Sequence, residues 1–228
     1  MKLKMCRANS LDALVAEKME RDVYHVRRYL RDADWVLDIG ANIGAFCLFV
    51  KEAYPGVNVV CVEPMPSNLE VLRENIGDCA IIEPAAISGH SGTVRIYDFG
   101  LANSGCHSMY DLGVPGAKPV EVQGITLMSL FEKYNICRLR FLKLDCQGAE
   151  YDVIQSAGAD LLRRIDVIAM EVHRTIAAGD SVLGTIPDQT ERAKAMFESL
   201  KQTHVLVHGD MFSFDTEQVW ENTRGVDA

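Results

Sequence analysis

One short stretch, residues 35–44, constrains the fold of this chain more than any other. It begins with Trp35-Val-Leu-Asp-Ile39, an apolar run of the kind that forms a buried β-strand. Two glycines, Gly40 and Gly44, follow, and apolar residues then recur at helical spacing in 45–50. The stretch therefore predicts a strand, a tight glycine turn and the start of a helix. Such a turn lets a ligand lie directly on the backbone, in front of the N–H groups of a helix N-terminus.

The acidic residue in this turn narrows the class of ligand. The pattern is D-x-G-x-x-x-G, with Asp38 where a dinucleotide-binding loop has its first glycine. A carboxylate there repels a pyrophosphate and suits a cation. S-adenosylmethionine (SAM) carries a sulfonium and an ammonium group, so the turn favours a SAM site. The residues predicted to form it are Asp38, Gly40, Asn42 and Gly44. Another nucleotide site and a purely structural turn remain open, whereas a NAD-dependent dehydrogenase is disfavoured.

Further acids stand at or near the ends of predicted strands. In nucleotide-binding α/β domains, a carboxylate about 20 residues beyond the glycine turn accepts hydrogen bonds from ribose hydroxyls. Glu63 ends the apolar run 57–63 at this position, so it is predicted to bind ribose, with a structural cap as the alternative. Asp145 and Glu171 end later apolar runs. Because parallel strands end at one edge of a sheet, these acids and Asp38 are expected to converge on one site.

Strands and helices alternate along most of the chain. Predicted helices cover 10–31, 45–50, 67–76, 127–134, a segment that starts at 149, and 188–202. Predicted strands cover 35–39, 57–63, 79–87, 93–99, 120–125, 139–145, 166–173, 205–207 and 211–214. This order favours an α/β fold with a doubly wound, seven-stranded, mostly parallel sheet, an antiparallel edge strand and helices on both faces. Ala86, near the end of the third strand, lies where loops commonly meet the base of a cofactor.

Composition bounds the class of protein. The 228 residues, 48% hydrophobic and 24% charged, suit a single globular domain over 1–228. No apolar run is long enough for a membrane span, and the first residues do not resemble a signal peptide. Seven cysteines without C-x-x-C spacing indicate reduced thiols, and so a cytoplasmic location. The formal net charge of −9 disfavours nucleic acid as a partner.

Two segments lie outside the regular alternation. Residues 1–33 are predicted to form an N-terminal helical extension. Residues 88–126 are too polar for a helix layer, and we expect them to form a hairpin-like insertion over the site. His107, in this insertion, is a candidate for contact with the substrate.

Four blocks of sequence resemble one enzyme family. They are Asp38-Ile-Gly-Ala-Asn-Ile-Gly44, Val62-Glu-Pro64, Lys143-Leu-Asp-Cys-Gln-Gly-Ala-Glu150 and Glu171-Val-His173. Their order and spacing resemble the FkbM family of SAM-dependent methyltransferases. The resemblance implies a class I, Rossmann-like methyltransferase fold with SAM as cofactor. It also implies O-methylation of sugars, glycans or polyketide-type metabolites, and hence a small-molecule or glycan substrate.

Three residues are candidates for catalysis. Methyl transfer from SAM requires an acceptor held in line with the sulfonium, and a base helps when the acceptor is a sugar hydroxyl. Asp145 is predicted to orient the acceptor or take its proton; contact with the amino group of SAM and a structural role are the alternatives. His173 titrates near neutral pH and is a second candidate base, although a structural role at a strand end is also open. Glu150 is the third candidate, but a carboxylate in a first helical turn also stabilises the helix.

The chain departs from the family pattern at Cys146-Gln147, where the family usually has Val-Glu. The change removes a charge beside the predicted site, so an inactive relative that binds SAM is one alternative. A metal-assisted O-methyltransferase with Mg²⁺ on Asp145 and Glu171 is another, but no compact ligand motif supports it and no metal site is predicted. A nucleophilic Cys146, as in cytosine-C5 methyltransferases, is disfavoured because Asp145 would raise the pKa of the thiol.

Overall fold

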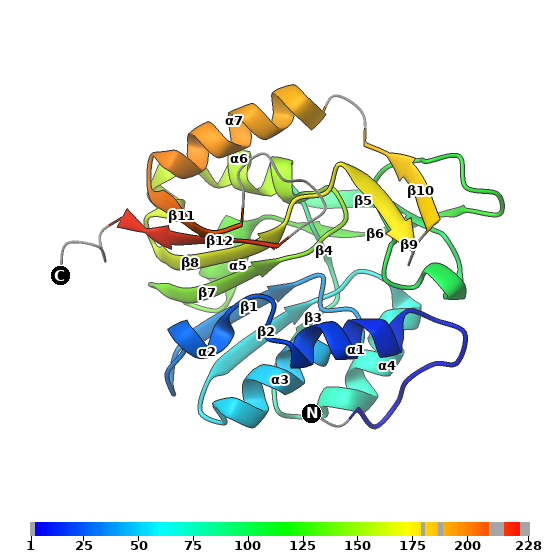
Figure 1. The fold of residues 1–228 in the computed structure, drawn as a ribbon, viewed down its shortest axis with the longest axis horizontal. Helices are drawn as coiled ribbons and strands as arrows, with labels where there is room; N and C mark the ends of the chain where they lie inside the picture. Colours follow the sequence, from blue (N-terminus) through cyan, green and yellow to red (C-terminus); the bar gives the residue numbers. More distant parts are fainter. Residues whose placement is uncertain (1–2, 179–180, 187–188, 210–216, 224–228) are drawn as a thin grey trace.

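A computed structural model describes residues 3–178, 181–186, 189–209 and 217–223 (Figure 1). Its main sheet has seven strands in the order β11-β12-β8-β7-β1-β2-β3. These strands are β1 (Trp35–Ile39), β2 (Asn58–Val62), β3 (Ile81–Glu83), β7 (Leu139–Leu144), β8 (Ile165–Glu171), β11 (His204–His208) and β12 (Glu217–Asn222). The predicted fold class is thereby confirmed.

Five neighbouring strands of this sheet, from β8 to β3, run parallel. The strand β12 is antiparallel both to β8 and to β11. It therefore lies one position inside the edge, and β11 is the edge strand. The chain runs outward from β1 through β2 to β3, and then crosses to β7 on the other side of β1. The order of strands thus reverses between β1 and β7, which is where open α/β sheets bind ligands.

Helices cover both faces of the sheet, as Figure 1 shows. One face carries α1 (Asp12–Glu20), α2 (Val26–Tyr29), α3 (Ala45–Ala53) and α4 (Pro66–Ile76). The other carries α5 (Leu127–Lys133), α6 (Glu150–Leu162) and α7 (Gln189–Lys201). Successive side chains of a strand point to opposite faces, so a strand buried on both faces supplies two hydrophobic cores. In β1, Val36 joins the core under α3, whereas Leu37 and Ile39 join the core under α6.

Two smaller sheets flank the site. The strands β4 (Ala86–Ile87), β5 (Gly92–Asp98) and β6 (Lys118–Ile125) form a three-stranded sheet in which β5 and β6 are an antiparallel pair. The 3₁₀ turn η1 (Leu101–Asn103) lies between β5 and β6. A second antiparallel pair, β9 (Thr175–Ala178) and β10 (Ser181–Thr185), follows β8 and was not predicted.

Several predicted elements differ from the structure. The helix expected over 10–31 is broken into α1 and α2 at Asp22, which has a φ of 52° and accepts hydrogen bonds from the N–H groups of Val26 and Arg27. The strand expected over 79–87 is divided between β3 and β4, in different sheets, around Pro84, which has no N–H to donate. The strand expected over 211–214 lies outside the described residues, and the next described strand is β12.

All seven cysteines are free thiols, as predicted. No helix in the described ranges is both long and apolar enough to cross a membrane.

Candidate active site

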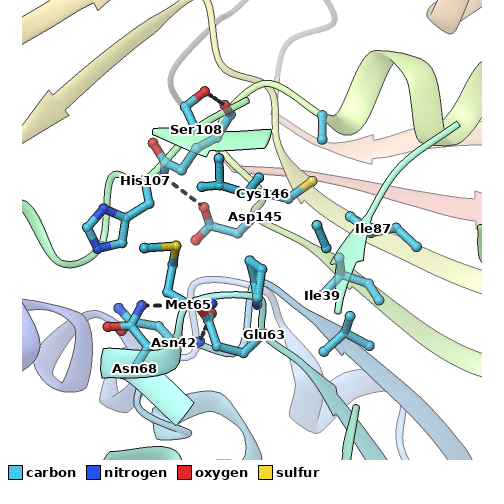
Figure 2. A pocket seen from close by; sticks show the side chains of 18 of the residues that line it. Ile39, Asn42, Glu63, Met65, Asn68, Ile87, His107, Ser108, Asp145 and Cys146 are labelled. Atoms are coloured by element: carbon cyan, nitrogen blue, oxygen red, sulfur yellow. Dashed lines mark hydrogen bonds between the residues drawn. The ribbon is translucent and has the colours of Figure 1, made fainter. Parts of the chain in front are cut away.

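A cavity opens at the carboxyl ends of the central strands, where the order of strands reverses. The space between its walls, open solvent at the mouth included, is about 550 Å³. Its lining comes from the ends of β1 and β2, the start of α4, the β4–β5–β6 sheet with its loop, and the turn after β7. Figure 2 shows Asn42, Glu63 and Asn68 on one side of the cavity and Asp145 and Ser108 on the other.

The two glycines of the turn after β1 have different roles. A Cβ on Gly40 would lie 1.9 Å from the carbonyl oxygen of Asp145, so only glycine permits this close approach of the two strand ends. Gly40 also lines the cavity. A Cβ on Gly44 would lie 2.6 Å from Cγ2 of Ile76. Gly44 is not among the residues that line the cavity, and its close approach to Ile76 shows that it packs α3 against α4. Its contact with a cofactor stays a prediction.

Asp38 does not line the cavity either, and its predicted contact with the cofactor stays a prediction. It alternates with Ile39, so its side chain points to the opposite face of the sheet. There it forms a fully buried ion pair with Lys143, whose Nζ lies 3.2 Å from Asp38 Oδ1. The same Nζ donates to the carbonyl oxygens of Ile39, at 3.2 Å, and Gly40, at 2.8 Å. Lys143 thus holds the glycine turn in place by hydrogen bonds to two of its carbonyl groups.

Lys143 had no predicted role, although the sequence offered a signal. A lysine between two leucines in the strand 139–144 must find acceptors when buried, because burial disfavours an unpaired charge. Burial lowers the pKa of Lys143, but Asp38 and Asp145 raise it more, and the net shift is upward. Lys143 is therefore charged. It supports the site electrostatically without lining the main cavity.

Glu63 lines the cavity, as predicted, and organises the residues around it. Its Oε2 accepts a hydrogen bond from the N–H of Asn42 at 2.9 Å. Its Oε1 accepts from the N–H of Met65 at 3.0 Å and from Nδ2 of Asn68 at 3.2 Å. Burial raises the pKa of Glu63, and these hydrogen bonds oppose that shift. A carboxylate has about four acceptor positions, so one position on Oε2 is left for a ligand hydroxyl.

Two amide oxygens in the cavity wall lack partners. Oδ1 of Asn42 and Oδ1 of Asn68 are buried, and neither has a hydrogen-bond partner among the described residues. Both residues line the cavity. Since buried acceptors are normally satisfied, these oxygens suit a ligand that donates hydrogen bonds. Asn42 and the lining residue Ala86 were predicted to meet the cofactor. Asn68 was considered only as a helix cap.

Asp145 lines the cavity directly after β7. Its Oδ2 accepts a hydrogen bond from the hydroxyl of Tyr24 at 3.1 Å, and its Oδ1 accepts from Nε2 of Gln147 at 3.3 Å. Burial alone would raise the pKa of Asp145. The nearby charges of Lys143, Lys18 and His173 lower it to about 2. Asp145 is therefore a carboxylate at neutral pH, which suits a cationic or hydrogen-bond-donating ligand.

The environment of His173 favours the protonated imidazole, which argues against a general base; the catalytic role of His173 stays a prediction. Burial lowers the pKa of this imidazole, but Glu150, Glu171 and Asp145 raise it further, to about 10. Its Nδ1 lies 3.0 Å from Oε1 of Glu150, and its Nε2 lies 3.7 Å from Oδ1 of Asp145. His173 is therefore protonated at neutral pH and cannot accept a proton there.

Glu150 is fully buried and does not line the cavity, so its contacts support a positioning role, and its catalytic role stays a prediction. Its Oε1 accepts from the N–H of Cys146 and its Oε2 from the N–H of Gly148, both at 2.9 Å. Together with its contact to His173, these bonds fix the turn that follows Asp145.

The departure at Cys146-Gln147 is compatible with this turn. The amide of Gln147 donates to Asp145, which the glutamate usual in the family could not do. Burial raises the pKa of Cys146 well above that of an ordinary thiol, and Glu150 and Asp145 add to the effect. This contradicts a nucleophilic role for Cys146, because the thiolate is the reactive form.

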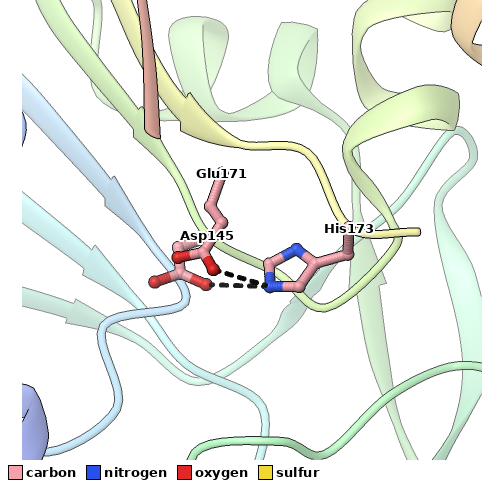
Figure 3. A group of neighbouring side chains, drawn as sticks. All are labelled: Asp145, Glu171 and His173. Atoms are coloured by element: carbon pink, nitrogen blue, oxygen red, sulfur yellow. Dashed lines mark ion pairs between the residues drawn. The ribbon is translucent and has the colours of Figure 1, made fainter. Parts of the chain in front are cut away.

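A group of possible metal ligands stands beside the cavity. Figure 3 shows one ring nitrogen of His173 paired with both Asp145 and Glu171. One ligand atom from each of the three residues lies within 4.8 Å of the others. Lys18 forms an ion pair with Glu171, and His173 is charged, so cations of the protein itself already face these carboxylates.

His107, the predicted contact for a substrate, lines the cavity. Its Nδ1 accepts a hydrogen bond from the N–H of Phe99 at 3.2 Å. Burial lowers the pKa of this imidazole, more than the nearby Asp98 raises it, so the ring is neutral. Because Nδ1 is occupied as an acceptor, His107 has an N–H rather than a free base to offer a ligand.

Known proteins resemble this chain in sequence. It is 26% identical over 207 residues to the 31-O-demethyl-FK506 methyltransferase FkbM of Streptomyces tacrolimicus, a match that covers 75% of this chain and 78% of that protein. It is 25% identical over 193 residues to Methyltransferase 1 of Beauveria bassiana, covering 72% of this chain and 76% of that protein.

Solved structures share the fold at low sequence identity. An rRNA methylase from Streptococcus thermophilus has a TM-score of 0.50 and 10% identity, covering 90% of this chain and 94% of that chain. A Streptococcus mutans protein in complex with SAH has a TM-score of 0.51 and 10% identity, and the match covers 90% of this chain and 97% of that chain. The family described as the methyltransferase FkbM domain matches residues 38–202, so this protein belongs to the FkbM family and is a SAM-dependent methyltransferase.

Proposed function

We propose that this enzyme transfers the methyl group to a hydroxyl of a small molecule, such as a sugar, a glycan or a polyketide-type metabolite. The relative from Streptomyces tacrolimicus carries an O-methylation in its name, which supports an oxygen acceptor. The observation that carries the proposal is the ionised carboxylate of Asp145 in the cavity wall, since a carboxylate can accept a hydrogen bond from an acceptor hydroxyl.

The residues of the cavity fit SAM. Glu63 has an acceptor position left for a ribose hydroxyl, and the orphaned amide oxygens of Asn42 and Asn68 suit further donors of the cofactor. Ala86 and the apolar residues around it suit the base. Asp145 offers a negative charge to the cationic end of SAM, which is the half of the cofactor that distinguishes it from an uncharged nucleoside.

When bound, SAM would supply a methyl group on a sulfonium, with a neutral thioether as the leaving group. The role of the protein is to hold the acceptor oxygen opposite that group and to exclude water. Asp145 orients the hydroxyl by accepting its hydrogen bond. The low pKa of Asp145 makes it a weak base, but the hydroxyl proton becomes more acidic as positive charge builds up on the attacking oxygen, and it then passes to the carboxylate of Asp145. His173 stays protonated and contributes charge rather than proton removal.

A metal-assisted O-methyltransferase is a second candidate because Asp145, Glu171 and His173 bring possible ligand atoms together. The ion pair of Lys18 with Glu171 and the charge of His173 favour the metal-free reaction. Activity in the presence of a chelator separates the two. Loss of activity with EDTA that Mg²⁺ restores would favour the metal-assisted reaction.

The proposal is tested with SAM carrying a labelled methyl group and a panel of hydroxyl-bearing sugars and macrolactones, with amines and thiols as alternative acceptors. We expect label in a methyl ether, and we expect Asp145→Asn to lower kcat by about 100-fold or more, since positioned carboxylates contribute on that scale. The control is Asp166→Asn, because Asp166 pairs with Arg138 and Arg140 outside the cavity. Transfer only to nitrogen or sulfur acceptors, or a normal kcat for Asp145→Asn, would contradict the proposal. No transfer to any acceptor would favour an inactive relative.

A further inference from the structure

Residues that precede the family match contribute side chains to the site. The match begins at residue 38, yet two side chains from before it belong to the charged network around Asp145. They are Lys18 on α1 and Tyr24 in the turn between α1 and α2. Neither residue was predicted to take part in the site, because helical spacing alone does not show which end of a sheet a helix covers.

The side chain of Tyr24 is fixed by burial, by two ring contacts and by a hydrogen bond. Its side chain is 1% exposed, and its ring meets the ring of Phe46 edge-on with centroids 5.9 Å apart. Nζ of Lys18 lies 5.8 Å from the centroid of the same ring. The hydroxyl of Tyr24 donates to Oδ2 of Asp145 at 3.1 Å. Since Nε2 of Gln147 donates to Oδ1, both oxygens of the carboxylate have a fixed donor and its plane is set.

Lys18 ties the same segment to the sheet. Its Nζ forms ion pairs with Glu171 at the end of β8 and with Oε1 of Glu217, at 2.8 Å, at the start of β12. Glu171 in turn faces His173, whose Nε2 lies 3.8 Å from it. The end of α1 is therefore anchored on the same carboxylates that surround Asp145.

The rest of the N-terminal segment follows the rim of the site. Asp12 is buried and forms an ion pair with Arg7. Its Oδ1 accepts a hydrogen bond at 3.4 Å from the hydroxyl of Ser104, a residue that lines the main cavity. Val15 and Met19 line a second cavity of about 380 Å³, whose other walls include the glycine turn and Asp145. The segment is thus packed against the glycine turn.

We propose that Tyr24 is a positioning residue: its hydroxyl fixes the Asp145 carboxylate in the orientation that SAM requires, so that a segment outside the family match completes the site. The inference rests on the proposed role of Asp145. The ring of Tyr24 is locked by Phe46 and Lys18, so the donor is in place before a ligand arrives. The free-energy cost of orienting the carboxylate is then met when the protein folds, so it does not reduce the affinity for SAM.

A double-mutant cycle on the whole chain tests this inference by calorimetric titration with SAM. Tyr24→Phe keeps the ring and removes only the hydroxyl, and we expect it to weaken SAM binding by about 10- to 150-fold, the range of a hydrogen bond to a charged group. Asp145→Asn should weaken binding at least as much. The double variant should bind like Asp145→Asn alone, because Tyr24 acts through Asp145 and residues in one network do not add.

Tyr29→Phe is the matched control. Tyr29 is also a buried tyrosine of the N-terminal segment, and its hydroxyl also meets a carboxylate, Glu221, at 2.7 Å, but it lies outside the cavity. Its variant should bind SAM within about twofold of the unmodified protein. The ratio of SAM affinity to SAH affinity is a second readout. Partial unfolding lowers both affinities equally, whereas a misplaced carboxylate changes the ratio in the same direction as Asp145→Asn does.

Two results would overturn the inference while leaving the proposed function intact. One is normal SAM binding by Tyr24→Phe when Asp145→Asn loses it. The other is a full additional loss in the double variant, which would mean that Tyr24 acts through general stability. Failure of the unmodified protein to bind SAM, or normal binding by Asp145→Asn, would instead remove the proposed role of Asp145 itself.

Discussion

Glu63 joins the glycine turn to the start of α4, because its carboxylate accepts N–H groups from both. Glu63→Gln replaces one oxygen by an amide NH₂, which would face the donors of Asn42, Met65 or Asn68. We expect SAM affinity to fall by about tenfold or more, since one buried donor is left without an acceptor and the ribose loses a charged partner.

Calorimetric titration of this variant against Glu70→Gln checks the prediction. Glu70 is an exposed glutamate on the same helix, α4, so its variant controls for the loss of one negative charge. Equal SAM affinity for the two variants would show that Glu63 shapes the turn without meeting the cofactor.

At the residue scale, the sequence predicted which acidic residues stand near the site better than it predicted the direction in which each side chain points. Glu63 and Asp145 were predicted at the cavity because both follow a strand directly. Asp38 was placed there as well, but it lies inside the strand, where the pleat turns its side chain to the opposite face. The packing role of Gly44 was not predicted because it depends on Ile76 of another helix, a contact that no local pattern reveals.

The edge strand β11 begins with a buried histidine whose charge state makes stability depend on pH. Nε2 of His204 lies 3.0 Å from the carbonyl oxygen of Ile165, and Nδ1 lies 2.7 Å from the hydroxyl of Thr203. Burial lowers the pKa of His204 to about 4. In the unfolded chain its pKa is about 6.5, so between these values the unfolded state binds a proton that the folded state does not.

The free energy of unfolding should therefore decrease as the pH falls below about 6.5. The contribution of His204 to this loss is about 2 kcal/mol at pH 5, and the loss levels off below the folded pKa. Urea unfolding of the unmodified protein and of His204→Gln at pH 7 and pH 5 measures it. The free energy of unfolding should decrease less for His204→Gln than for the unmodified protein between pH 7 and pH 5. Equal decreases for the two proteins would contradict a neutral, buried His204.

At the element scale, long periodic segments were predicted well and their interruptions were not. The helix α7 and the strands β1 and β7 agree with the predicted ranges within about two residues, which is the usual uncertainty of an element boundary. The break between α1 and α2 depends on the side chain of Asp22 taking over backbone donors. The division into β3 and β4 depends on which neighbouring strand each segment meets.

At the scale of the whole molecule, the convergence of acids could be predicted because it follows from parallel strands. The contributions of the N-terminal segment could not. Tyr24 and Lys18 reach the site across more than a hundred residues of chain, and such contacts follow from how α1 packs on the sheet. The charge states follow from the same packing. The pKa of His173 rises to about 10 only because three carboxylates surround it.

The central claim is that the cavity between the ends of β1 and β7 is a SAM site. Calorimetric titration of the purified protein with SAM and, separately, with NAD⁺ tests it most directly. We predict SAM binding with a Kd on the order of 1 μM, about −8 kcal/mol, and no heat with NAD⁺. No binding of SAM, or binding of NAD⁺ in the same range, would contradict the account.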